Sequence, residues 1–319
     1  MCPESEIHFR LKNNIIHPLE TDNPWEAKPA RRRKPIPELM VKEYTRPAAD
    51  KHIHPDSLRS FSALKKTISY LLSFKSEFTN SARWPIAYYF IKDRFRAVRQ
   101  DLIVQRLPAS QSIELLEEMI PFYLESEYRC ELQQTPNYDR KLHKTELEEC
   151  FSRWKSALDS LEEKKFSRDM MLAYFLHHID DSSFRYEILK WETALSDLTS
   201  TFNDLYFSIC IGNYVRFFRL ARSLQESIWR YALFPHIGMY RCHALKAFSA
   251  AFCGKSITLP TSELSEWLAF SNEDSLWDCL NDMFELDPNS GSTVKFYKCV
   301  HRVNFNENHL KLYWFSISL

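Results

Sequence analysis

The chain has 319 residues, of which 45% are hydrophobic and 14% are aromatic. This composition supports two or three domains with buried cores and excludes a disordered protein. The 42 basic residues balance the 42 acidic ones, so the molecule as a whole is not expected to capture nucleic acid electrostatically, although local charged patches can still do so.

Glycine is scarce, with only four in the chain, at positions 212, 238, 254 and 291. A phosphate-cradling loop needs several glycines close together, because backbone N–H groups must reach the anion. The sequence therefore lacks the dinucleotide-binding, P-loop and nucleophile-elbow motifs, and we expect no cofactor.

Eight cysteines are scattered along the chain without a C-x-x-C pair, and the first residues are polar rather than a secretory signal. Reduced thiols in the nucleus or the cytoplasm are therefore expected. No run of about 18 apolar residues occurs, so we expect no membrane span.

Residues 1–55 are rich in proline, histidine and charge, and we treat them as an extended N-terminal segment. A short helix is expected from Glu38 to Tyr44. The segment also carries a compact basic cluster that contacts RNA, contacts an acidic partner, acts as a nuclear import signal, or is simply an exposed linker. This cluster consists of Arg31, Arg32, Arg33 and Lys34.

From residue 56 to residue 256, apolar residues recur at steps of three and four, which is the period of amphipathic helices. Their lengths and close spacing are typical of stacked helical pairs, so a helical solenoid is expected here. The expected helices cover residues 58–74, 84–107, 110–134, 138–163, 167–178, 183–198, 202–213 and 215–233.

The helix expected at 84–107 carries two parallel stripes of side chains. The apolar stripe consists of Ile91, Phe95, Val98 and Leu102. The basic stripe consists of Lys92, Arg96, Arg99 and Arg106. We expect the apolar stripe to be buried and the basic stripe to face solvent or a partner.

Residues 257–319 differ in pattern from the helical region before them. A short helix after Pro260 and a second helix opened by a capping box at Ser271 and Asp274 precede a turn at 287–291. Two stretches rich in β-branched and aromatic residues follow, at 293–300 and 309–316. Helix, helix, strand, strand is the order of a winged-helix module, so the fold class is mainly α, a solenoid followed by a winged helix.

The second helix of this module is unsuited to reading duplex DNA. Residues 261–287 contain eight acidic residues and no lysine or arginine, and phosphates would repel such a helix. We expect it to bind a protein partner instead, through Asp278, Asp282 and Glu285. The mildly basic wing, with Lys295 and Lys298, is expected to touch RNA weakly.

Possible metal and catalytic residues do not form a convincing site. Cys242 and His243 lack the paired spacing of zinc ligands. The adjacent His177 and His178 point to different sides of a helix, and we read them as a helix end. No catalytic residue and no metal site are predicted, so we do not expect an enzyme.

Three blocks resemble those of the SAC/GANP family, in the right order along the chain. The first is Met1-Cys2-Pro3 with Glu6, followed by Pro18-Leu19-Glu20. The second, VKEYTRPAADK at 41–51, includes Arg46, Pro47, Asp50 and Lys51. The third, DRFRAVRQD at 93–101, includes Asp93, Arg94, Arg96, Arg99 and Asp101. The resemblance extends over essentially the whole chain.

The resemblance implies a PCI-like helical solenoid with a C-terminal winged helix, acting as a scaffold rather than an enzyme. It implies a PCI-domain protein and a small acidic subunit as partners. Because the chain starts almost at the first block, it resembles in this respect a short family member linked to centrosome duplication and the mitotic spindle. The alternative is an adaptor in a nuclear-pore-associated complex for transcription-coupled mRNA export, which binds RNA jointly with its PCI partner.

Overall fold

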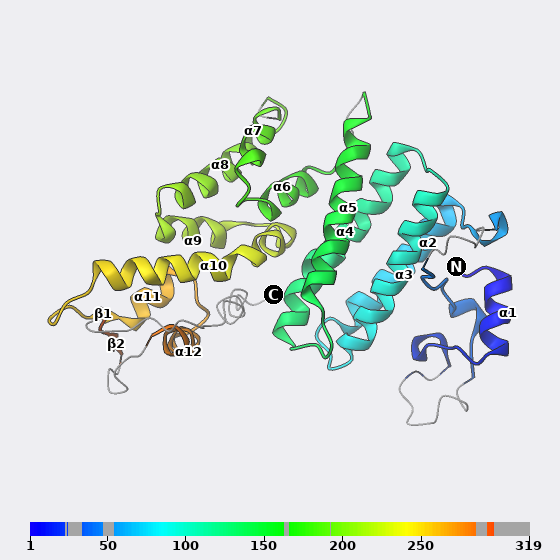
Figure 1. Cartoon of the computed structure of the whole chain (residues 1–319), viewed down its shortest axis with the longest axis horizontal. Coiled ribbons are helices and arrows are strands. Elements are labelled where there is room, and N and C mark those ends of the chain that lie inside the picture. The colour runs from blue at the N-terminus through cyan, green and yellow to red at the C-terminus, as the bar shows by residue number, and fades with distance from the viewer. Residues whose placement is uncertain are drawn as a thin grey trace. The chain divides into compact units, whose positions relative to one another are not determined.

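The computed structural model describes residues 1–22, 24, 34–46, 54–162, 166–191, 193–284 and 292–296 (Figure 1). In these residues the chain forms twelve α-helices and two short strands. The predicted mainly α fold class is therefore confirmed, whereas the solenoid and winged-helix assignments stay predictions. None of the described helices combines the length and the hydropathy needed to cross a bilayer.

The chain divides into two compact units, residues 1–166 and 167–319. The N-terminal segment, which we expected to be a separate region, belongs to the first unit. The expected boundary between residues 256 and 257 falls inside the second unit and stays a prediction.

Four long helices dominate the first unit and run alongside one another (Figure 1). They are α2 (Phe61–Phe78), α3 (Trp84–Val104), α4 (Ala109–Leu132) and α5 (Arg140–Asp159). Side-chain caps begin two of them: Ser60 accepts from the backbone of Ala63, and Asp139 accepts from that of Leu142. The predicted helices in this region are confirmed to within a few residues at each end.

Aromatic side chains form the centre of the first unit. Trp84, Tyr88 and Phe95 of α3 are fully buried, as are Phe122 of α4 and Trp154 of α5. Phe95 meets Phe122 edge to face at 5.2 Å between ring centroids, a favourable aromatic geometry. The apolar stripe predicted on α3 is therefore buried as expected.

The N-terminal segment is more ordered than its composition suggested. It begins with α1 (Glu4–Lys12), which the sequence analysis did not predict, and continues through short 3-10 helices at Pro18–Glu20, Pro37–Leu39 and Pro55–Ser57. The helix expected from Glu38 to Tyr44 is wrong beyond its first residues, since residues 40–46 are extended.

The second unit begins with a group of five helices. They are α6 (Arg168–His177), α7 (Ser182–Leu189), α8 (Ser196–Cys210), α9 (Tyr214–Ser223) and α10 (Ser227–Ala251). Helix α10 contacts both α6 and α9. The predicted helix at 183–198 is wrong, because α7 ends at Leu189 and α8 starts only at Ser196. The predicted helix at 215–233 is also wrong, because α9 ends at Ser223 and α10 starts at Ser227 and continues through Pro235 to Ala251.

A smaller module follows: β1 (Leu259–Pro260), α11 (Thr261–Trp267), α12 (Glu273–Met283) and β2 (Thr293–Val294). The two strands pair antiparallel, with Leu259 opposite Val294. The second helix is capped by Asn272, which accepts from the backbone of Ser275, and not by Ser271 as expected. The expected strand at 293–300 is described only to residue 296, and the one at 309–316 lies outside the described residues.

Arg241 anchors this module to α10. Its guanidinium is fully buried, donates to the carbonyl oxygens of Leu268 at 3.0 Å and Ala269, and lies over the ring of Phe270 at 3.8 Å. Burial lowers the pKa of Arg241 to about 9. Those carbonyls follow the last turn of α11, whose own amides cannot satisfy them, so Arg241 fixes the turn between α11 and α12.

Glu131, near the end of α4, gives the first unit a pH-dependent stability. Burial raises its pKa from 4.5 to about 7, despite the nearby Arg140 and with a further contribution from Glu127. Because folding raises this pKa, the stability tied to the protonated carboxyl is present below about pH 4.5 and is lost as the pH rises to about 7.

We therefore expect Glu131→Gln to be more stable than the parent chain at pH 8, by about 2–4 kcal/mol. The advantage should shrink to a few tenths of a kcal/mol at pH 4.5, where the parent carboxyl is protonated in the folded state and about half protonated in the unfolded state. Urea unfolding at the two pH values measures this, with Glu77→Gln at an exposed position as the control. An equal effect of Glu131→Gln at both pH values would contradict the prediction.

Candidate functional site

The three family blocks meet at α3. The N-terminal segment lies against this helix and buries Leu19, Met40 and Val41. The charged residues of the blocks take part in three groups: those of Glu20 and Asp101 at the N-terminal segment, and that of Glu146 on α5.

Glu20 is completely buried and is held by two arginines. Its carboxylate pairs with Arg10 of α1 and with Arg94 of α3, the latter at 3.2 Å. The backbone N–H groups of Val41 and His17 also donate to it, at 3.1 and 3.2 Å. Burial opposes ionisation of Glu20 by desolvation, but Arg94, Arg10 and the Val41 N–H together hold its pKa below its usual value.

Glu43 extends this group from the second block. It pairs with Arg94 at 2.9 Å and with Arg10 at 3.1 Å. Its own backbone N–H donates to Glu6 of α1 at 2.8 Å. Asp93 accepts from the backbone N–H of Tyr44 at 3.3 Å. The first, second and third blocks are thus joined by direct hydrogen bonds.

The opening residues of the first block start the helix that supplies Arg10. The carbonyl oxygen of Pro3 accepts from the backbone N–H groups of Glu6 and Ile7, at 3.1 and 3.0 Å. Burial, together with the nearby Glu6 carboxylate, raises the pKa of Cys2 to about 12. A thiol with that pKa is a poor nucleophile at neutral pH, so the block positions α1 rather than supplying a reactive cysteine.

Asp101, at the end of the third block, is the centre of the second group. It is fully buried, pairs with Lys42 at 2.6 Å and with the Nε of Arg59 at 2.7 Å. Lys42 also donates to the carbonyl oxygen of Ser57 at 2.7 Å. This group fastens the chain on both sides of residues 47–53 to α3.

The third group joins α3 to α5 through Glu146. Lys92 lies 3.6 Å and Arg96 3.4 Å from its carboxylate, and Arg99 donates to its backbone carbonyl at 2.7 Å. Desolvation outweighs these cations and raises the pKa of Glu146. Desolvation likewise lowers the pKa of Lys92.

The expected solvent-facing basic stripe is therefore wrong for Lys92 and Arg99, which are only 7% and 6% exposed. Arg96 is half-buried, with its guanidinium 4.0 Å from the centre of the Tyr44 ring. Of the four stripe residues, Arg106 is exposed. The periodicity located these cations correctly but could not show that carboxylates from distant segments cover them.

Several members of these groups were not predicted from the sequence. Arg10, Lys42, Arg59 and Glu146 were not singled out as functional residues. Of these four residues, only Arg10 belongs to a local sequence pattern, because it follows Glu6 by one helical turn at the spacing of an i,i+4 pair. The charged atoms of the two side chains lie 3.9 Å apart.

The remaining motif residues are only partly placed. Arg46 is exposed, and Pro47, Asp50 and Lys51 lie outside the described residues. Arg31, Arg32 and Arg33 also lie outside them, whereas Lys34 is exposed and its backbone N–H donates to Asp22 at 3.3 Å. The proposed nucleic-acid contact of this basic cluster stays a prediction.

An acidic face lies on the C-terminal module of the second unit. The exposed acids of α11 and α12 are Glu263, Glu266, Glu273, Asp274 and Asp278. Glu285 and Lys298 lie outside the described residues, as does the side chain of Asp282, while Lys295 is exposed. Helix α12 thus places Asp278 where the sequence predicted it, on the surface.

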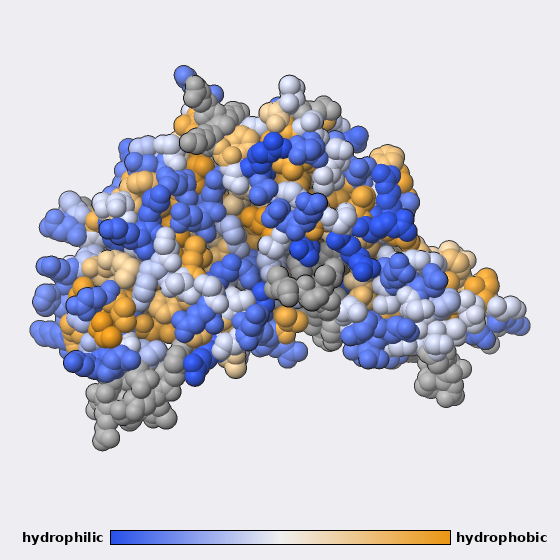
Figure 2. All heavy atoms as spheres, turned by 180° about the vertical axis from the view of Figure 1, so that it is seen from behind, coloured by the Kyte–Doolittle hydropathy of each residue, from blue (hydrophilic) through white to orange (hydrophobic). Residues whose placement is uncertain are grey.

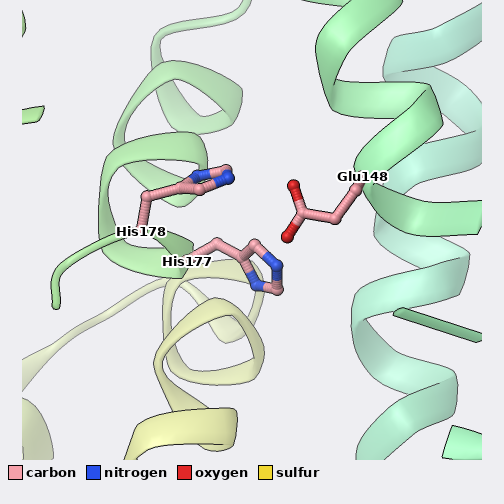
Figure 3. Close-up of side chains that lie close together, drawn as sticks. All are labelled: Glu148, His177 and His178. Atoms are coloured by element: carbon pink, nitrogen blue, oxygen red, sulfur yellow. The ribbon is translucent and has the colours of Figure 1, made fainter. Parts of the chain in front are cut away.

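The histidines considered as metal ligands lie at the end of α6, as expected. Figure 3 shows His177 and His178 on adjacent positions there, and Glu148 on α5 of the first unit. His178 contacts the Tyr174 carbonyl oxygen at 2.8 Å through Nδ1, and its ring stacks on Phe184 at 4.3 Å. Within the described residues, neither unit by itself brings three metal-ligand side chains together.

Comparison with known proteins agrees with the three blocks. The model of the SAC3/GANP family matches residues 1–285. The chain belongs to the SAC3/GANP family. It is 27% identical to SAC3 family protein B of Arabidopsis thaliana over 303 residues, and 22% identical to Protein xmas of Drosophila melanogaster over 302 residues. These alignments cover 86% and 87% of the chain but only 17% and 14% of the relatives.

Removing the charge of Glu20 tests whether the blocks are structural. Glu20→Gln removes the fully buried carboxylate shared by Arg10 and Arg94 and leaves them only the partly exposed Glu43, so we expect it to lower the free energy of unfolding by about 3–5 kcal/mol. Chemical denaturation measures the loss. The control is Asp204→Asn, which removes an exposed pair with Arg216 and should cost less than about 1 kcal/mol. Similar losses for the two variants would show that the buried group does not hold the segment.

Proposed function

We propose that this SAC3/GANP chain is a non-catalytic scaffold that binds a PCI-domain protein through its C-terminal module. The observation that carries the proposal is that the charged residues of the family blocks form ion pairs and hydrogen bonds within the first unit. Asp93, Arg94, Arg99 and Asp101 bond to other parts of the first unit. Charged side chains that pair in this way stabilise the fold of the first unit. They do not point into a cleft where a substrate would react.

The acidic face of α11 and α12 supports the choice of a protein partner. Exposed carboxylates on two adjacent helices favour a basic protein surface and repel phosphates. A PCI-domain protein with a basic winged helix has the complementary chemistry, as the family resemblance implies. A small acidic subunit would then bind the partner or another part of this chain, since the acidic face itself would repel it.

In cells, we propose that the scaffold acts in centrosome duplication and spindle progression, and is present in both nucleus and cytoplasm. The support is the family resemblance of the sequence blocks. Imaging a tagged chain through the cell cycle tests this proposal. Accumulation at centrosomes and on the spindle is the expected result, and a purely nuclear-rim signal throughout would contradict it.

The second candidate is an adaptor for transcription-coupled mRNA export that binds RNA jointly with its partner. The exposed Lys295, directly after β2, favours it because this lysine can reach a phosphate. The two candidates share the partner and differ in location and in RNA binding, so one set of variants addresses both.

Charge reversal on α12 tests the partner interface. We expect Asp278→Lys with Asp282→Lys to reduce recovery of the partner with the tagged chain at least tenfold, because like charges would then face each other. Quantitative mass spectrometry of the purified complex measures the recovery. The control reverses the exposed Glu38 and Glu77 of the first unit and should change nothing. Undiminished recovery with the α12 variant would place the interface elsewhere.

Binding of RNA should require the partner. The chain alone is expected to bind a single-stranded oligonucleotide weakly, without sequence preference and with a steep loss at higher salt, as phosphate neutralisation dictates. The complex should bind more tightly because two modest patches act together. Filter binding at two salt concentrations measures both affinities. Lys295→Glu with Lys298→Glu should weaken RNA binding by the complex and leave partner binding intact, and tight, salt-independent binding by the chain alone would contradict the scaffold proposal.

A further inference from the structure

A groove of about 1060 Å³ runs along α5 in the first unit, beside the turn from α3 into α4. Its wall on α5 extends from Lys141 to Ser160, roughly 28 Å at the rise of an α-helix. That is longer than the site of a single small ligand and has the length of a helical peptide of about five turns.

Four exposed cations line this groove, and none of them forms an ion pair with a described residue. They are Arg106, Lys141, Lys144 and Arg153. Two acids also line it, Glu148 and Glu149, so the cations outnumber the acids by four to two, and Glu149 is engaged by Arg99 at 3.0 Å. The groove is therefore a basic surface whose charge is not neutralised by the described part of the chain.

These cations contrast with the other basic residues of α3. Lys92, Arg94, Arg96 and Arg99 all meet carboxylates of the first unit. Arg106, the last of the basic stripe, lies beyond the reach of those groups and opens into the groove instead. Its backbone is left-handed, with φ of 49°, and it ends α3 where Leu107 N donates to Leu102 O at 3.3 Å.

The same turn supplies apolar surface. Ile103 is 40% exposed and Leu107 is half-buried, and both line the groove beside Arg106. Gln105 holds the turn in place by donating to the carbonyl oxygen of Arg59 at 2.9 Å. An apolar end next to a basic wall is therefore fixed by the fold before any ligand arrives.

We propose that this groove binds a short acidic segment of a partner protein that carries aliphatic side chains along one face. The cations would meet its carboxylates, and Ile103 and Leu107 would receive its aliphatic residues, the helix-in-groove mode of recognition. Single-stranded RNA fits less well, because none of the described residues that line the groove is aromatic and able to stack a base, and the carboxylates of Glu148 and Glu149 would face its phosphates. This surface is separate from the acidic face of α11 and α12, so the proposal does not depend on the proposed function.

The test uses three labelled probes in anisotropy titrations of the full chain. One is a synthetic amphipathic peptide of leucine and glutamate at helical spacing, the second has the same composition without that spacing, and the third is an oligouridylate of equal length. We expect the amphipathic peptide to bind most tightly, at least tenfold better than the scrambled one. Failure to bind it at about 1 mM, or tighter binding of the oligouridylate that depends on the groove lysines, would overturn the proposal.

Two groove variants and a control locate the binding. Lys141→Glu with Lys144→Glu should weaken binding of the amphipathic peptide at least tenfold at low salt. The loss should be smaller at high salt, because salt screens the attraction between exposed charges. Ile103→Asp should weaken binding of the amphipathic peptide at both salt concentrations. The control, Lys190→Glu with Arg219→Glu, reverses two exposed cations of the second unit and should leave affinity unchanged. Circular dichroism checks that each variant is folded, and equal affinity for the groove variants and the parent would overturn the proposal.

Discussion

The burial of one carboxylate, that of Glu20, determines how the first unit is assembled. A carboxylate with no solvent exposure is tolerated only when cations and N–H groups surround it. Arg10, Arg94 and the backbone of Val41 supply these, each from a different part of the chain. Satisfying Glu20 therefore requires α1, the extended residues 40–46 and α3 to be in place at the same time, which makes the N-terminal segment part of the fold.

A hydrophobic contact would not impose the same arrangement. Apolar packing between the segment and α3 stabilises any register that buries the same area, whereas the guanidinium groups of Arg10 and Arg94 bond only in fixed directions. Leu19, Met40 and Val41 supply the burial, and the charged groups select one position among those the burial permits. The second charged group, at Asp101, repeats this logic for the chain on the other side of residues 47–53, through Lys42 and Arg59.

The sequence predicted features that depend on neighbouring residues, and it did not predict features that depend on residues far along the chain. The helices of the first unit were found because side-chain period is a local property, and α3 is placed to within three residues of its expected ends. The burial of Lys92 and Arg99 was not found, because it depends on Glu146, about fifty residues along the chain. The split of residues 183–198 into α7 and α8 was missed for a related reason: Trp191 and Leu195 continue the apolar period, yet Leu195 and Ala194 bond back to Trp191 in a turn. The acidic character of α12 could be predicted from composition alone, and Asp278 is exposed as expected.

The first unit and the C-terminal module use charge in opposite ways, and this bears on the scaffold role proposed above. In the first unit, most cations of α3 form ion pairs with carboxylates of the same unit. Substituting these cations therefore destabilises the fold before it affects the binding of any partner. In the C-terminal module, the carboxylates of α11 and α12 are solvated, and the buried Arg241 of α10 bonds to the backbone carbonyls of Leu268 and Ala269 rather than to these acids. The acids of that module therefore remain available to a binding partner. An interface built from solvated charges forms quickly and responds to ionic strength, while the buried groups that hold the platform are far less screened by salt.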